Sequence, residues 1–186
     1  SFTALLVFTF LSSLSWASSY QEDCGAQSLQ NVSFQYCLYQ DPQSSSRDVL
    51  YVLHGAGMDA RYWKVVGPSL EFAWEDMKAQ KPKVAVISFG QMWLLVKKNG
   101  SPNSGLLDLF VSEILPWVEN TKFKSPASAR KILGYSMGAF NTTQVILQYP
   151  KLFQKAALAC PFLMDLSPYA RTEEILSYLK YSRAIL

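Results

Sequence analysis

The sequence of 186 residues is long enough for one domain with its own hydrophobic core. Hydrophobic residues make up 49% of it and aromatic residues 14%, a composition that is typical of a globular protein and excludes an intrinsically disordered one. The formal net charge is only +3, and the lysine and arginine residues are spread along the chain. The charge therefore argues against a nucleic-acid-binding protein, and we expect no nucleic-acid partner.

Residues 1–19 have the pattern of a secretory signal peptide without its first, basic region. The run from Phe2 to Leu11 is almost entirely apolar, and a serine-rich segment that contains Ala17 follows it. Ser15 and Ala17 suit the positions before a cleavage site, so we expect cleavage after Ala17. The run is about ten residues long, whereas a membrane span needs about 20. A membrane anchor is the alternative, but we favour a secreted or periplasmic protein with no span after signal removal.

The chain contains three cysteines, and disulfide bonds persist in exported proteins. Cys24 precedes the first expected strand and Cys37 lies near its end, so the two could pair, which the sequence leaves open. Cys160 ends an apolar segment, where we expect a buried thiol. The odd count leaves at least one cysteine unpaired within the chain or paired outside it.

Short apolar runs and longer helical patterns alternate along the chain after the signal segment. We expect strands at 33–39, 49–53, 84–89, 131–134 and 156–160, and helices at 69–80, 106–119, 137–148 and 172–181. Tyr62 and Trp63 are expected in a loop before the first of these helices, and Pro116 is expected to bend the second. The alternation predicts an α/β protein with a doubly wound, mostly parallel sheet and helices on both faces.

A Gly-x-Ser-x-Gly pattern lies between the strand at 131–134 and the helix at 137–148. Its three fixed residues are Gly134, Ser136 and Gly138. This spacing is typical of a nucleophile elbow, in which a strained turn lifts the serine clear of the sheet. Glycine suits both outer positions because neighbouring backbone passes where a Cβ would stand. We therefore predict that Ser136 is a catalytic nucleophile; a plain strand–turn–helix is the alternative.

A second glycine-rich stretch, residues 54–57 with the sequence His-Gly-Ala-Gly, follows another expected strand. Since the carboxyl ends of parallel strands meet at one edge of a sheet, this stretch and Ser136 can face each other. Acyl transfer needs two N–H donors aimed at the developing oxyanion. We expect one from Met137, the residue after the nucleophile, and the other from Ala56.

His54 is the only histidine in the chain and is therefore the first candidate for a general base. It precedes Ser136, however, whereas the base of this arrangement comes last, in the order serine, acid, histidine. We therefore assign His54 a structural role, in which a ring hydrogen bond supports the loop that carries Ala56. Gly55 and Gly57 allow the backbone of this loop to come close to the developing oxyanion. A single histidine and no Cys/His cluster predict no metal site.

These motifs together resemble the esterase D-like branch of the α/β-hydrolases, which includes S-formylglutathione hydrolase, feruloyl esterases, enterochelin esterase and the mycolyltransferases. The resemblance covers residues 34–165. It rests on His54-Gly55-Ala56-Gly57-Met58-Asp59, Trp63, Gly134-Tyr135-Ser136-Met137-Gly138-Ala139 and Tyr149-Pro150-Lys151-Leu152-Phe153. The resemblance implies the α/β-hydrolase fold and a serine hydrolase that cleaves carboxylic esters, small or polymer-linked, without a cofactor.

The chain departs from this family in one respect: no histidine follows Ser136. Asp165 comes too early for the family's acid, and Glu173 and Glu174 suit the first turn of a helix. The chain is then either a fragment or a degenerate relative. The missing initial Met and an ending within helical sequence favour a fragment. Residues 20–186 would form the N-terminal two-thirds of the hydrolase domain, with the acid and the histidine beyond Leu186.

The sequence therefore predicts a secreted serine esterase that forms an acyl-enzyme on Ser136, and we expect this chain alone to be nearly inactive. A non-catalytic hydrolase-fold binding protein and an acyltransferase that uses the same acyl-enzyme are the alternatives. Tyr135 and Met137 flank the serine and are expected to touch the acyl group. Tyr62, Trp63 and Trp93 either join Tyr135 in a substrate pocket or belong to the core.

Overall fold

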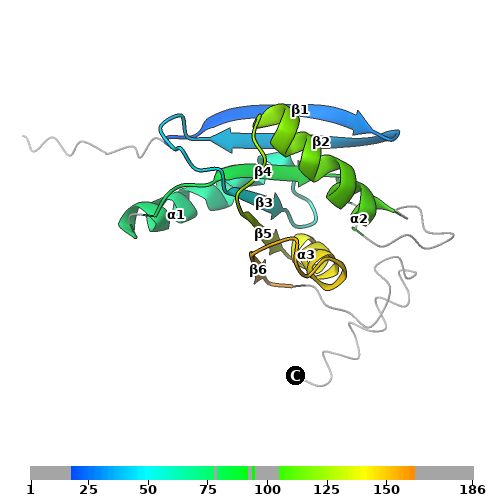
Figure 1. The fold of residues 1–186 in the computed structure, drawn as a ribbon. Helices are drawn as coiled ribbons and strands as arrows, with labels where there is room; N and C mark the ends of the chain where they lie inside the picture. The colour runs from blue at the N-terminus through cyan, green and yellow to red at the C-terminus, as the bar shows by residue number, and fades with distance from the viewer. Residues whose placement is uncertain (1–17, 78, 92–93, 95–104, 162–186) are drawn as a thin grey trace, which may run out of the picture.

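The computed structural model describes residues 18–77, 79–91, 94 and 105–161. Six strands form one sheet in the order β1-β2-β4-β3-β5-β6 (Figure 1). The first two neighbouring pairs, β1–β2 and β2–β4, are antiparallel, whereas β4, β3, β5 and β6 run parallel to one another. The strands are β1 (Gln21–Leu29), β2 (Val32–Gln40), β3 (Val49–Leu53), β4 (Lys83–Ser88), β5 (Arg130–Tyr135) and β6 (Lys155–Ala159).

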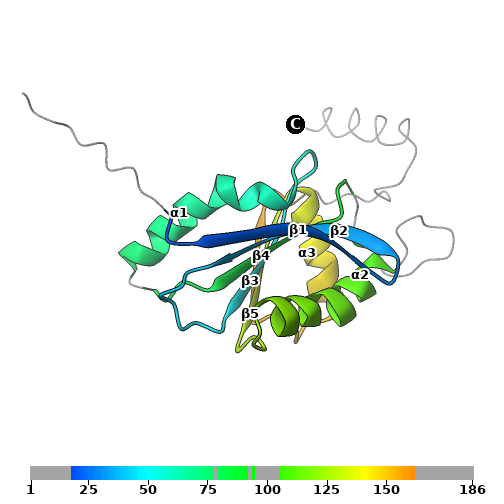
Figure 2. The same ribbon diagram turned by 90° about the horizontal axis from the view of Figure 1, so that it is seen from above.

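Helices cover both faces of this sheet, as the alternating pattern predicts. Helix α1 (Trp63–Asp76) lies on one face, and α2 (Leu106–Leu109) and α3 (Met137–Gln148) lie on the other (Figure 2). Each face has its own core. Trp63 packs with Leu50, Val52, Val84 and Val86 on the α1 face, and the opposite core contains Tyr51, Phe110, Ile114, Ile132 and Val145. All five residues of β3 are buried, which is why this strand reads as a continuous apolar run.

The parallel strands end together at one edge of the sheet. Leu53, at the end of β3, pairs with Gly134 of β5, and Tyr135 pairs with Ala159 of β6. The segments that follow β3 and β5 therefore begin side by side. This register brings the two glycine-rich stretches of the sequence to the same place.

The structure corrects both bounds of the first predicted helix, 69–80, because α1 begins at Trp63 and ends at Asp76. A turn of 3₁₀ helix at Ala60–Tyr62 runs directly into α1, so Tyr62 and Trp63 are not in a loop. Asp59 begins this turn, since its carboxylate accepts the N–H of Arg61 at 2.7 Å. Gly67 permits the early start because a Cβ there would stand 2.6 Å from the Trp63 ring. The ring can therefore pack against the helix.

Strand β1 is a second difference, since no strand is expected before residue 33. Most of its residues are polar and exposed, so it lacks the apolar alternation that marks a strand. It pairs with β2 through a two-residue turn in which Gln30 and Asn31 both have positive φ, 49° and 64°. Such a turn matches the twist of a hairpin. Cys24 and Cys37 lie directly opposite each other in this hairpin and form the disulfide that the sequence leaves open.

Cys160 is exposed, which corrects the expectation of a buried thiol. It follows β6, the edge strand of the described sheet, whose five residues are all exposed. The apolar sequence of β6 suggests a covered strand, but the described residues do not cover it. The predicted helix at 172–181 and the residues Trp93, Asp165, Glu173 and Glu174 lie outside the described residues, as does almost all of the predicted signal peptide.

The helical segment that begins with α2 runs to Lys122, slightly beyond its predicted end. Two wide turns, Phe110–Ile114 and Trp117–Lys122, lie on either side of Pro116. In such turns the N–H bonds a carbonyl five residues back, as Phe123 N–H does with Val118 O at 2.8 Å. Among the helices of the described residues, none is both apolar enough and long enough to cross a bilayer.

Candidate active site

Ser136 stands in a strained turn between β5 and α3. Its backbone angles are φ 52° and ψ −113°, a conformation that non-glycine residues rarely adopt. Its N–H donates to the carbonyl of Ala159 on β6 at 2.9 Å, which ties the turn to the neighbouring strand. The residue is half-buried. Strain of this kind costs about 1–3 kcal/mol and persists where the surrounding structure imposes it.

The two glycines of the pattern let three backbone segments meet at this turn. A Cβ at Gly134 would stand 2.2 Å from the carbonyl oxygen of Gly138 and 2.4 Å from Thr142 Oγ1. A Cβ at Gly138 would stand 1.9 Å from the carbonyl oxygen of Leu53. Real Cβ atoms do not make contacts this short, so glycine is required at both positions.

The segment His54–Asp59, here called the oxyanion loop, leaves the end of β3 and runs beside Ser136. A Cβ at Gly55 would stand 2.8 Å from the Tyr135 ring and 3.3 Å from the Ser136 Cβ, so the loop backbone lies directly against the serine. Gly57 has φ +79°, a conformation that favours glycine. The second glycine-rich stretch of the sequence thus lies beside the serine, as the strand order predicts.

His54 lies inside the molecule, with 3% of its surface exposed. Its Nδ1 is 2.8 Å from the carbonyl oxygen of Gly55, and its Nε2 is 2.7 Å from the hydroxyl of Ser88. Burial lowers the pKa of His54, although the Gly55 carbonyl and the charge of Asp59 oppose this effect. Both ring nitrogens are engaged, so neither is available to take a proton from Ser136.

The two N–H groups that the sequence predicts for an oxyanion hole, those of Met137 and Ala56, lie in different surroundings. Met137 begins α3, so its N–H belongs to the unpaired first turn of a helix, where negative charge is stabilised. Ala56 is exposed on the oxyanion loop. Neither N–H has a hydrogen-bond partner among the described residues. The Met137 side chain is buried, with 3% exposed, so the backbone of this residue is the part that the site can use.

An aromatic pair lies next to the serine. The rings of Tyr62 and Tyr135 stack with their centroids 5.8 Å apart and their planes at 27°. Burial is the main cause that raises the pKa of Tyr62, and the charges of ionised Tyr135 and Cys160 nearby raise it further. Tyr62 is nonetheless buried and Trp63 lies in the core, so of the proposed pocket residues Tyr135, which is half-buried, is the one beside the serine.

Sequence reasoning missed two residues that hold the oxyanion loop. Ser88 ends β4 and bonds the His54 ring, and Gln91 accepts the N–H of Gly57 at 2.7 Å through its side-chain oxygen. Both follow or end a strand that is parallel to β3 and adjacent to it. If the order of the strands had been known, the position of β4 beside β3 would have pointed to these two residues. The sequence alone does not determine which strand lies beside β3.

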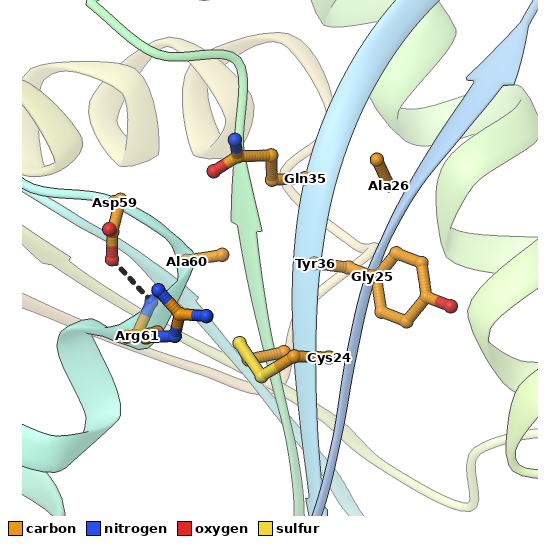
Figure 3. A pocket seen from close by; sticks show the side chains of 9 residues that line it. Cys24, Gly25, Ala26, Gln35, Tyr36, Asp59, Ala60 and Arg61 are labelled. Carbon is orange, nitrogen blue, oxygen red and sulfur yellow. Dashed lines mark hydrogen bonds between the residues drawn. A yellow bond between two sulfur atoms is a disulfide. The ribbon is translucent and has the colours of Figure 1, made fainter.

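No catalytic partner for Ser136 is found in the described part of the chain, where no imidazole or carboxylate is hydrogen-bonded to it. One cluster of potential metal ligands occurs among the described residues, formed by Glu22, Cys24 and Cys37. The two cysteines are joined in the disulfide and do not offer thiolates. The disulfide borders a hollow between β1, β2 and the segment Asp59–Arg61 (Figure 3), which Ser136 does not line.

Comparisons with solved structures show the fold. The chain is similar to a ferulic acid esterase with a TM-score of 0.61 and 17% identity, over 84% of this chain and 65% of that one. It is similar to an S-formylglutathione hydrolase from Agrobacterium tumefaciens with a TM-score of 0.62 and 15% identity, over 78% and 59%. It is similar to the siderophore hydrolase EstA from Aspergillus nidulans with a TM-score of 0.51 and 13% identity, over 77% of this chain and 58% of that one. The chain thus spans less than two thirds of each of these structures.

Comparisons of sequence give the family. No curated protein matches the chain significantly. The family model described as "Putative esterase", however, matches residues 30–174, most of the chain. That segment contains both the oxyanion loop and the turn around Ser136. The chain therefore belongs to this esterase family and has the fold of the α/β-hydrolases.

Proposed function

We propose that this protein is a serine esterase that hydrolyses carboxylic esters through an acyl-enzyme on Ser136. The observation that carries the proposal is the strained φ of Ser136 in a turn that the oxyanion loop contacts directly. Strained non-glycine residues concentrate at active sites. Membership of the esterase family and the α/β-hydrolase fold support the same activity.

In the proposed reaction the Ser136 hydroxyl attacks the ester carbonyl carbon, and its proton passes to a general base. The negative charge that develops on the carbonyl oxygen would be stabilised by the N–H groups of Met137 and Ala56. Collapse of this intermediate releases the alcohol, which takes the proton, and leaves an ester on Ser136. Water then hydrolyses that ester by the same steps and releases the acid.

The general base of this mechanism is not His54, because its two ring nitrogens are hydrogen-bonded to the Gly55 carbonyl and the Ser88 hydroxyl. The sequence contains no other histidine. Since the chain spans less than two thirds of the similar hydrolases, we propose that a histidine and an acid encoded beyond Leu186 complete the site. The substrate class is a small or polymer-linked carboxylic ester. The Cys24–Cys37 disulfide supports export to an oxidising compartment.

The test compares the 186-residue chain with the protein extended by the coding sequence that follows Leu186, using p-nitrophenyl acetate. We expect the extended protein to hydrolyse this ester and Ser136→Ala to lower kcat by at least about 10³-fold, while the 186-residue chain stays near background. Ser136-dependent hydrolysis by the 186-residue chain at ordinary esterase rates would contradict the assignment of the base.

A non-catalytic binding protein with the hydrolase fold is the second candidate. The engagement of both nitrogens of the only histidine favours it, because this imidazole is then not free to take the proton of Ser136. A stop codon directly after Leu186, together with no hydrolysis that depends on Ser136, would support this candidate over the esterase. A histidine and an acid at later strand ends would support the esterase.

A further inference from the structure

We propose that Ser88 and Gln91, at the carboxyl end of β4, are positioning residues for the oxyanion loop. Ser88 holds His54 as its Nδ1–H tautomer, and Gln91 holds the N–H of Gly57. The two contacts together orient the Ala56 N–H. This inference deepens the proposed function and rests on it for its kinetic consequence. The hydrogen-bond arrangement itself can be measured without any activity.

The tautomer of His54 follows from what its partners can do. A carbonyl oxygen only accepts, so Nδ1, at 2.8 Å from the Gly55 oxygen, must carry the hydrogen. In a neutral ring Nε2 is then an acceptor, and the Ser88 hydroxyl at 2.7 Å must donate to it. The Ser88 oxygen in turn accepts the N–H of Gly90 at 3.1 Å. Every group in this chain of hydrogen bonds has one consistent role, and burial favours the neutral ring.

The His54 contact determines where the Ala56 N–H points. In a trans peptide the carbonyl and the following N–H point in opposite directions. The Gly55 carbonyl is held toward the imidazole by His54 Nδ1 and accepts a second bond from the N–H of Met58 at 3.3 Å. The Ala56 N–H of the same peptide must therefore point away from the imidazole. It is this N–H that has no partner among the described residues.

Gln91 fixes the next peptide of the loop. Its side-chain oxygen accepts the N–H of Gly57 at 2.7 Å, and this N–H belongs to the peptide that joins Ala56 to Gly57. The two contacts thus hold the peptides on both sides of Ala56. Ser88 and Gln91 lie close together in the sequence at the end of one strand, so the end of β4 orients the loop that follows β3.

The first experiment measures the ¹⁵N resonances of the single histidine in the 186-residue chain at pH 7.5 by NMR. We expect a protonated Nδ1 and an unprotonated Nε2, whereas a free imidazole in water prefers the other tautomer. In Ser88→Ala the Nε2 resonance should move downfield because its hydrogen bond is lost, and in Ser46→Ala, a buried serine elsewhere, it should not. A protonated Nε2 in the wild type would overturn the proposal.

The second experiment measures ester hydrolysis by the extended protein. Ser88→Ala and Gln91→Ala should each lower kcat roughly ten- to a hundred-fold with little change in KM, because a misplaced donor weakens binding of the transition state alone. Ser88→Thr and Gln91→Glu keep an oxygen in place and should restore most of kcat. Gln43→Ala, an exposed glutamine, is the control. Unchanged kcat in the folded alanine variants would overturn the positioning role.

The two experiments separate the two proposals. If the wild-type extended protein hydrolyses no ester, the proposed function fails, whereas the NMR result still decides the tautomer of His54. If the esterase is active but the NMR spectrum shows a protonated Nε2, the proposed function stands and the positioning role of Ser88 is wrong.

Discussion

The carbonyl oxygen of Leu53 occupies the space in which a side chain at residue 138 would begin. A Cβ at Gly138 would stand 1.9 Å from this oxygen, and both belong to backbone in regular elements, the end of β3 and the start of α3. The strand and the helix therefore meet at a distance that only glycine allows. This contact places the turn around Ser136 directly against the beginning of the oxyanion loop.

Gly138→Ala should therefore destabilise the protein by about 3 kcal/mol, because neither backbone segment can move without disturbing the sheet. Gly90→Ala is the matched control: its φ is +71°, but a Cβ there has no atom within 4 Å, so only a conformational cost of about 1–2 kcal/mol is expected. Urea unfolding measures both. Equal losses in the two variants would show that the Leu53 contact is not the limiting one.

The sequence predicts the elements around the site better than those far from it. The helix at 137–148 has the predicted bounds, because the elbow glycines mark its start and Tyr149-Pro150 its end. The long apolar strands are also located within a residue or two, since strands covered on both faces leave a strong hydrophobic signal. Near the site, the turn-forming residues and the buried apolar runs of the sequence therefore mark the same element boundaries.

The elements that sequence reasoning missed depend on tertiary contacts. Strand β1 is polar and exists through its pairing with β2 and the disulfide. Helix α1 starts early because Trp63 is buried against the sheet. The roles of Ser88 and Gln91 depend on the position of β4 beside β3. No local pattern encodes such long-range neighbours, so the structure was needed to find them.

The carboxylate of Glu119 should be the most important ionised group for stability among those described. Only 2% of the residue is exposed, and the carboxylate accepts bonds from Arg130 Nε at 2.6 Å, Arg130 Nη2 at 2.9 Å and the Tyr51 hydroxyl at 2.8 Å. Glu119→Gln leaves Arg130 without its partner and should cost about 3 kcal/mol. Glu75→Gln breaks the more exposed pair with Lys81 and should cost less than about 1 kcal/mol. Similar losses in urea unfolding would contradict this ranking.

The disulfide between Cys24 and Cys37 should hold β1 on the sheet, because this strand buries little apolar surface of its own. The double variant Cys24→Ser/Cys37→Ser should lose up to about 3 kcal/mol of stability in the loop-closure description. Amide hydrogens of β1 and β2 should exchange faster. Cys160→Ser changes an exposed thiol instead and should leave the exchange rates unaltered. Unchanged protection of β1 in the double variant would show that pairing alone holds the strand.

The buried imidazole of His54 should make stability depend on pH. Burial lowers its pKa in the folded protein below the ordinary value of 6.5. Well above pH 6.5 almost no proton is bound to His54 in either the folded or the unfolded state, so His54 contributes almost no pH dependence there. As the pH falls below 6.5, the unfolded state takes up a proton that the folded state excludes. The free energy of unfolding should then fall, by at most about 1.4 kcal/mol per pH unit.

Urea unfolding of the wild type and His54→Asn at pH 7.5, 6.5 and 5.5 measures this slope. Glu119 does not interfere in this range: its pKa is lowered from 4.5, so its stabilisation is lost only as the pH falls below that value. We expect the wild type to lose stability between pH 6.5 and 5.5, and His54→Asn to lose less over the same interval. Parallel curves for the two proteins would mean that the folded state accepts a proton on His54. The hydrogen bonds from Ser88 and to Gly55 would then not keep the ring neutral.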